Sequence, residues 1–123
     1  MLAVGLMSGT SLDGIDAVLC EITGFGLNTK IEQKNFIIYP LPASIKETIK
    51  RCCKSEGVGT DVICSLNFEL GELFSNAAQF VCAKAGIATQ NLDFISCHGQ
   101  TIYHIPRKTN QFVASTLQIG ESA

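Results

Sequence analysis

Apolar side chains in the first third of the chain fall into short runs that glycine or proline bounds. The runs at residues 2–7 and 15–22 are typical of buried strands, and the small residues between them predict a hairpin. Residues 31–39 alternate loosely between apolar and polar and stop before Pro40, which predicts a third strand. Three strands joined by tight turns predict an antiparallel meander.

Apolar residues then recur at helical spacing in two segments. The first predicted helix covers residues 43–54 and begins at Pro42 or Ser44. The second covers residues 61–85, where an apolar stripe keeps a period of 3.6 residues along the whole segment. Thr60 or Asp61 is the expected cap of this helix, and Gly86 its expected end.

The last third predicts two more strands. Residues 94–97 form a run that is too apolar to face water on either side, and residues 115–119 resume a strand after a polar loop. The first of these strands delivers residues 98–101 at its carboxyl end, where open α/β sheets bind ligands. The order of the elements predicts an α/β fold with a mixed sheet and packed helices.

Composition narrows the class of protein. The 123 residues fit one domain or less, and 46% hydrophobic against 16% charged residues is rich in apolar side chains. This balance suits a piece of a larger protein whose remaining part covers apolar surface. A net charge of −2 provides no basic footprint for nucleic acid or an anionic membrane. No apolar run is long enough to span a bilayer.

Six cysteines are present without a recognisable signal peptide and without a C-x-x-C pair. Disulfides and a zinc site are therefore poorly supported, and the pattern predicts a reduced, cytoplasmic protein. The cysteines are Cys20, Cys52, Cys53, Cys64, Cys82 and Cys97.

The turn at Ser8–Gly14 carries more polar groups than the reversal of a chain requires. Its backbone N–H groups can form an anion-binding nest, and Gly9 and Gly14 would let a phosphate approach the backbone. Asp13 could hold Mg²⁺, with Asp16 as a second candidate. A structural hairpin with polar decoration is an equal alternative, because polar turns are common. The spacing excludes a Walker A loop and a nucleophile elbow.

A second polar cluster follows the predicted strand at residues 94–97. Four polar side chains lie within seven residues, which makes them candidates for substrate contact. They are His98, Gln100, Thr101 and His104. A Cys97–His98 nucleophile dyad is rejected, because adjacent strand residues point to opposite faces. Glu69 and Glu72 on the long helix are interpreted as solvated, since no further carboxylate or histidine partner accompanies them.

Three stretches of the chain resemble the anhydro-N-acetylmuramic acid kinase family, which belongs to the actin, sugar kinase and heat-shock ATPase superfamily. They are Met7–Asp16, Ser96–His104 with Pro106, and Thr116–Glu121, in the family's order. The resemblance implies a ribonuclease H-like, actin-like ATPase lobe that is incomplete at its carboxyl end. Residues 1–123 would then be an amino-terminal nucleotide-phosphate-binding lobe, with the second lobe absent.

The resemblance also implies an activity for the parent protein in cell-wall recycling. The family converts 1,6-anhydro-N-acetylmuramic acid, ATP and water to N-acetylmuramic acid 6-phosphate and ADP. The expected ligands are ATP, Mg²⁺ and the sugar, and homodimers are common in the family. Two alternatives stay open, namely another phosphotransferase or ATPase of the superfamily and a non-catalytic nucleotide-binding or assembly module.

The resemblance places the catalytic base, an Asp, in a later motif, so no residue here is expected to act as the base and the 123 residues alone are expected to be inactive. Asp13 is the expected metal link, and His98, Gln100, Thr101 and His104 are the candidates for the sugar. The residues expected at the ATP phosphates are Ser8, Gly9, Thr10, Ser11, Leu12, Asp13, Gly14, Ile15 and Asp16.

Overall fold

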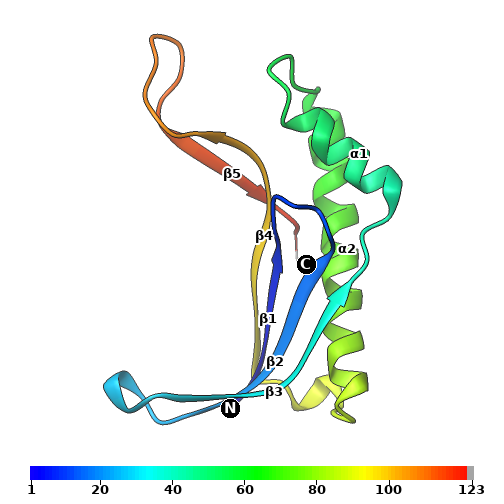
Figure 1. Cartoon of the computed structure of the whole chain (residues 1–123), viewed down its shortest axis with the longest axis vertical. Coiled ribbons are helices and arrows are strands. Elements are labelled where there is room, and N and C mark those ends of the chain that lie inside the picture. Colours follow the sequence, from blue (N-terminus) through cyan, green and yellow to red (C-terminus); the bar gives the residue numbers. More distant parts are fainter. Residues whose placement is uncertain (122–123) are drawn as a thin grey trace.

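A computed structural model describes residues 1–121 as a five-stranded sheet with two helices packed on one of its faces (Figure 1). The order of the strands in the sheet is β3-β2-β1-β4-β5. The elements are β1 (Leu2–Ser8), β2 (Ile15–Thr23), β3 (Lys30–Tyr39), α1 (Ala43–Cys52), α2 (Thr60–Lys84), β4 (Phe94–Ile105) and β5 (Ser115–Ile119), with short 3-10 turns at Gly26–Asn28 and Thr89–Asn91.

The sheet is mixed, as the order of the elements predicts. β1, β2 and β3 form an antiparallel meander, with Leu2 opposite Glu21 and Ser8 opposite Ile15 in the first hairpin. The two helices then carry the chain back, so that β4 lies parallel to β1 on its other edge. β5 pairs antiparallel with the second half of β4. The predicted α/β fold and the three-stranded antiparallel set are confirmed.

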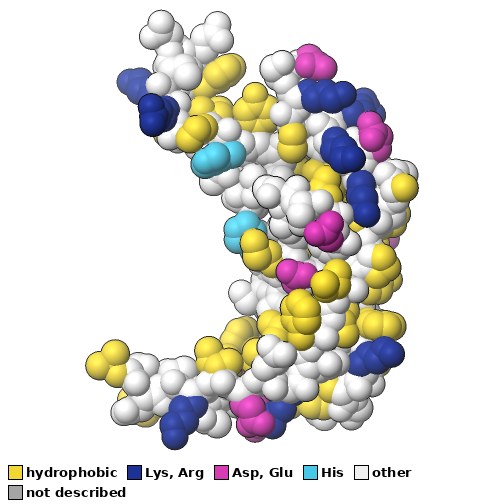
Figure 2. All heavy atoms as spheres, viewed as in Figure 1, with side chains coloured by type: hydrophobic (Ala, Val, Ile, Leu, Met, Phe, Trp, Pro, Cys, Tyr) yellow, Lys and Arg dark blue, Asp and Glu magenta, His cyan; other side chains and the backbone are white. Residues whose placement is uncertain are grey.

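The hydrophobic core lies between the helices and the meander. Alternate residues of β1 and β2, such as Val4 and Leu19, point toward α2 and are fully buried. The stripe on α2 meets them with Leu66, Leu70, Phe74, Ala77, Ala78, Val81 and Cys82, all of them buried. The opposite face of the sheet carries no helix and is hollowed (Figures 1 and 2).

The ends of the helices correct one expectation. Pro42 is the cap of α1, but α2 begins after Gly59, so the expected cap at Thr60 or Asp61 is wrong. Asp61 lies inside the first turn, where its carboxylate accepts the backbone N–H of Val62 at 2.9 Å and favours the positive end of the helix dipole. Gly86 ends α2 at φ 69°, in the left-handed conformation that closes a Schellman motif.

The structure of β4 differs from the expectation in two ways. The strand runs on to Ile105, so the polar cluster lies within it rather than beyond its end, because pairing with β5 keeps residues 100–105 extended. The prediction that neither side of residues 94–97 faces water is also wrong. Phe94 and Ile95 are 43% and 51% exposed, because Phe94 lies on the face without helices and the helices leave the start of β4 uncovered on the side of Ile95.

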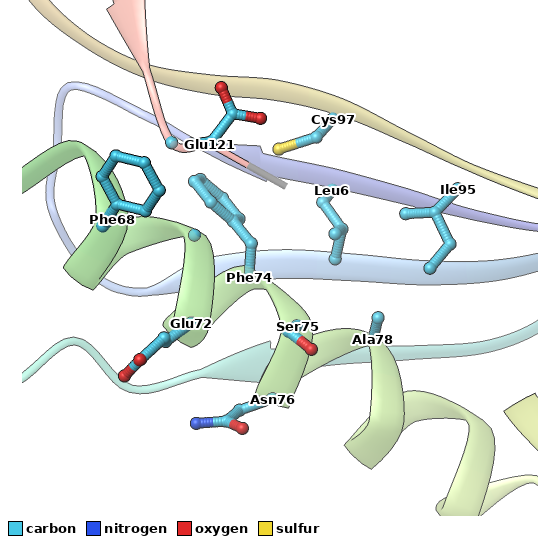
Figure 3. A pocket seen from close by; sticks show the side chains of 12 residues that line it. Leu6, Phe68, Glu72, Phe74, Ser75, Asn76, Ala78, Ile95, Cys97 and Glu121 are labelled. Carbon is cyan, nitrogen blue, oxygen red and sulfur yellow. The ribbon is translucent and has the colours of Figure 1, made fainter. Parts of the chain in front are cut away.

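A groove of about 750 Å³ lies beside α2, over the uncovered part of β4 (Figure 3). Its strand side is formed by Leu6, Ile95 and Cys97, and its helix side includes Phe68 and Ser75.

Among residues 1–121, neither α1 nor α2 has the length and apolar content that a membrane-spanning helix needs.

We expect Leu70→Ala to lower the free energy of unfolding by about 2–5 kcal/mol, because Leu70 is fully buried between α2 and the sheet. Gln79→Ala on the exposed side of the same helix is the control, with a change within about 0.5 kcal/mol. Urea unfolding of both variants provides the measurement, and equal midpoints would contradict the packing described here.

Candidate functional site

The loop between β1 and β2 is fixed at its middle by an apolar anchor. The backbone N–H of Leu12 donates to the Gly9 carbonyl at 3.2 Å, which closes a turn. Leu12 adopts φ 56°, the left-handed region that is uncommon for a residue with a side chain. Its side chain is only 8% exposed and belongs to the hydrophobic core. The packing of the Leu12 side chain in the core therefore holds the loop in one conformation.

The polar side chains of the loop point the other way. Thr10, Ser11 and Asp13 are all exposed, so their hydroxyl and carboxylate oxygens are open to solvent. Asp16, at the start of β2, is exposed as well, whereas Ile15 beside it is fully buried. The arrangement presents two hydroxyls and two carboxylates around a shaped backbone turn.

The two glycines of the loop lie in different surroundings, so a side chain would be tolerated at one and not at the other. A Cβ added at Gly9 would meet only the Ser11 hydroxyl, at 3.9 Å, so the space above Gly9 is open. A Cβ at Gly14 would lie 2.6 Å from the Tyr39 carbonyl oxygen and 2.7 Å from the Ile38 side chain. Gly14 is buried under the end of β3, and the idea that it leaves room for a phosphate is not supported by its surroundings.

Ser8 and Gln100 are buried together, at 2% and 1% exposure. The Ser8 hydroxyl donates to Gln100 Oε1 at 2.5 Å, and Gln100 Nε2 donates to the Thr101 carbonyl at 2.9 Å. No other polar or charged side chain among residues 1–121 is buried. Both residues are candidates for ligand contact in the sequence, yet in the structure they face each other beneath the surface.

The strand register brings the remaining candidates to the hollowed face. Leu6 points toward the helices, so Met7 points to the open face, and Asp16 lies opposite Met7 in the hairpin. Cys97 pairs with Leu6 and lines the groove beside α2, so His98 turns to the open face too. Asp16 and His98 are thus two strand spacings apart, or about 10 Å.

The second half of β4 extends this face toward β5. The Thr101 hydroxyl accepts a hydrogen bond from Gln118 Nε2 at 2.9 Å, and His104 is exposed. The two histidines of the chain both lie along the hollow (Figure 2). The hollowed face therefore combines Asp16, His98, Thr101 and His104, and the loop lies at the end of β1 next to it.

The surroundings of Cys97 argue against a nucleophilic dyad. Burial raises the pKa of the Cys97 thiol, an effect that outweighs the opposing hydrogen bond from the Gly99 backbone N–H. All six cysteines are free thiols. Glu69 and Glu72 are exposed as expected, and residues 1–121 contain no group of three or more side chains arranged to hold a metal ion.

Sequence reasoning missed two structural contributions. Leu12 is recognisable as the one apolar residue within a polar turn, a signal for an anchor. Asn67 of α2 is half-buried, and its side-chain oxygen accepts the backbone N–H groups of Gly120 and Glu121 at 2.7 and 3.1 Å. No local signal distinguishes Asn67, because α2 carries other polar residues and the partners of Asn67 lie more than fifty residues away.

The sheet order, the packed helices and the shaped hairpin loop are those of the amino-terminal lobe of sugar kinases and actin-like ATPases. Residues 1–123 match the sequence profile described as anhydro-N-acetylmuramic acid kinase, over the whole chain. The chain belongs to the anhydro-N-acetylmuramic acid kinase family.

Individual relatives carry the same name. The chain is 61% identical to an anhydro-N-acetylmuramic acid kinase of Clostridioides difficile (strain 630), 47% to one of Bacillus thuringiensis subsp. konkukian (strain 97-27) and 46% to one of Bacillus cereus (strain Q1). Each alignment covers 100% of this chain and 32% of the relative. The chain thus spans about a third of the length of the curated relatives it matches.

The contrast between the two glycines is testable by a matched pair of substitutions. We expect Gly14→Ala to lower the free energy of unfolding by about 1–3 kcal/mol, because the new methyl group would collide with the backbone of β3. Gly9→Ala should leave stability nearly unchanged, since its Cβ enters open space. Urea unfolding measures both variants, and similar losses at the two positions would contradict the described geometry.

Proposed function

We propose that the protein to which this chain belongs phosphorylates 1,6-anhydro-N-acetylmuramic acid with ATP and water, giving N-acetylmuramic acid 6-phosphate and ADP. The observation that carries the proposal is the match of the whole chain to kinases of that name, at up to 61% identity among the relatives described above. In this proposal residues 1–123 form the amino-terminal nucleotide-phosphate-binding lobe of a cytoplasmic enzyme.

The loop supplies the phosphate side of the site. Open space above Gly9 admits a phosphate to the backbone, and the exposed hydroxyls of Thr10 and Ser11 can donate to its oxygens. Because Leu12 anchors the loop in the core, these donors keep their positions before a ligand arrives. Phosphoryl transfer depends mainly on such positioning and on electrostatic stabilisation of the phosphates.

The carboxylates beside the loop fit a magnesium ion. Mg²⁺ in phosphotransferases is typically bound by one or two carboxylates together with substrate phosphates, so a closed cluster of protein ligands is not required. Asp13 and Asp16 are both exposed next to the loop and could hold the ion, which would neutralise phosphate charge.

The sugar side is assigned to the polar residues of the hollowed face. His98, Thr101 and His104 come from one strand and offer imidazole and hydroxyl groups to a polar ligand. Gln100 belongs to the same stretch, but its side chain is turned inward and hydrogen-bonded there. No residue of this chain is assigned the role of catalytic base.

The test is magnesium-dependent transfer of phosphate from ATP to 1,6-anhydro-N-acetylmuramic acid by the full-length protein. Formation of N-acetylmuramic acid 6-phosphate only when the anhydro sugar is present would support the proposal. Transfer to plain hexoses instead, or no transfer by a folded protein that binds ATP, would refute the assigned substrate.

Gly9→Val in the full-length enzyme should lower the use of ATP roughly 100-fold or more, because a branched side chain would fill the space proposed for a phosphate. Far-ultraviolet circular dichroism and the unfolding midpoint should match those of the parent protein. Steady-state kinetics with varied ATP gives the result. Unchanged kcat and KM for ATP would place the phosphates elsewhere.

Asp13→Asn should lower the activity by about 10- to 100-fold and raise the magnesium concentration needed for half-maximal rate, since an amide is a weaker ligand than a carboxylate. Asp61→Asn, on the exposed start of α2, is the charge-matched control and should behave like the parent protein. A magnesium titration that is identical for Asp13→Asn and its control would exclude Asp13 from the metal site.

A further inference from the structure

We propose that the buried hydrogen bond between Ser8 and Gln100 fixes the position of the phosphate loop, the segment between β1 and β2, relative to the polar residues of β4. The inference rests on the proposed kinase function. Ser8 and Gln100 then do not contact a ligand. Their role is to align the β1–β2 loop, which binds phosphate, with the polar residues of β4, which bind the sugar.

The single hydrogen of the Ser8 hydroxyl is committed to Gln100. Gln100 Nε2 donates to the Thr101 carbonyl, so Oε1 is the atom that faces Ser8 and can only accept. A serine hydroxyl has a single hydrogen, and Ser8 donates it to Gln100. Phosphate oxygens need donors, so the Ser8 side chain cannot contact a phosphate while this bond exists. Thr10 and Ser11 remain the hydroxyl donors of the loop.

The burial of the pair makes its geometry well defined. Ser8 and Gln100 are the two buried polar side chains in the part of the chain that the structure describes. A buried polar group that loses its partner pays the full cost of desolvation, so the two side chains are strongly held to each other. The same bond would be weak and replaceable by water at the surface.

The pair lies where two functional segments begin to diverge. Ser8 is the last residue of β1, and the phosphate loop starts directly after it. Gln100 follows a shift in the β1–β4 register, where Gly99 adopts φ 78°, and His98 precedes that shift on the open face. A displacement of Ser8 therefore moves the loop relative to His98 and Thr101.

This geometry predicts a specific kinetic effect. Loss of the bond should leave each surface able to bind its own ligand but should misalign the two, so kcat should fall while both KM values stay similar. We expect Ser8→Ala and Gln100→Met in the full-length enzyme to lower kcat by about 10- to 100-fold, with KM for ATP and for the sugar changed by less than about 3-fold.

The double variant Ser8→Ala with Gln100→Met separates positioning from stability. Ser8→Ala leaves Gln100 Oε1 without its partner, and Gln100→Met leaves the Ser8 hydroxyl without one and also removes the bond to the Thr101 carbonyl. The double variant removes both Ser8 and Gln100 side-chain polar groups, so we expect its unfolding midpoint to rise above that of Gln100→Met while kcat stays as low as in the single variants. Ser8→Ala removes one oxygen only, so it remains a folded test if Gln100→Met does not fold.

Asn35→Leu serves as the matched control. Asn35 Nδ2 donates to the Val81 carbonyl at 3.1 Å in a half-buried bond between β3 and α2, away from the loop. This variant should lose stability without a change in kcat.

Three results would overturn the proposal: kcat within about 2-fold of the parent in folded variants, recovery of kcat together with stability in the double variant, or a rise in KM for ATP alone. An unmutated enzyme that transfers no phosphate would instead refute the proposed function.

Discussion

The parallel pairing of β1 with β4 is the contact on which the rest of this structure depends. It joins residues that are about ninety positions apart in the sequence, with Ala3 opposite Phe94 and Leu6 opposite Cys97. Such a pairing needs a crossover that returns the chain to the starting end of the sheet, which α1 and α2 provide. The crossover also covers the apolar face of the first hairpin, so one topological requirement produces both the core and the juxtaposition of the loop with β4.

The pairing explains why one loop and one strand can act together. The hairpin loop lies at the end of β1, and the polar cluster lies along β4 beside it. The open face collects Asp16 and His98 because both strands present alternate residues to it at the same level. On the other face, the helices exclude water from Ser8 of β1 and Gln100 of β4. The sheet thus has a polar surface on its open side and a buried polar hydrogen bond on its helix side.

Local patterns were sufficient for most of the fold and insufficient for the site. The hairpin, both helices and β5 could be predicted because glycine, proline and apolar periodicity act over a few residues. The length of β4 could not be predicted, because its second half is kept extended by pairing with β5. That pairing depends on a partner strand elsewhere in the chain and leaves no pattern in the sequence of β4 itself. Ser8, Thr10 and Ser11 are equivalent hydroxyl donors in the sequence, but only the register shows that Ser8 turns inward. Gly14 likewise could not be distinguished from Gly9 without the position of Tyr39.

The anchored Leu12 has a thermodynamic consequence for any anion that the loop accepts. A loop of small residues that orders only around its ligand must lose backbone entropy at that moment, about 1–2 kcal/mol for each residue that becomes fixed. Here the burial of one leucine side chain orders the turn during folding, and the left-handed backbone of Leu12 is tolerated for that reason. The contacts made with the ligand are then not offset by the ordering of the chain. A single apolar side chain buried in the core can in this way raise the affinity of the loop for an anion.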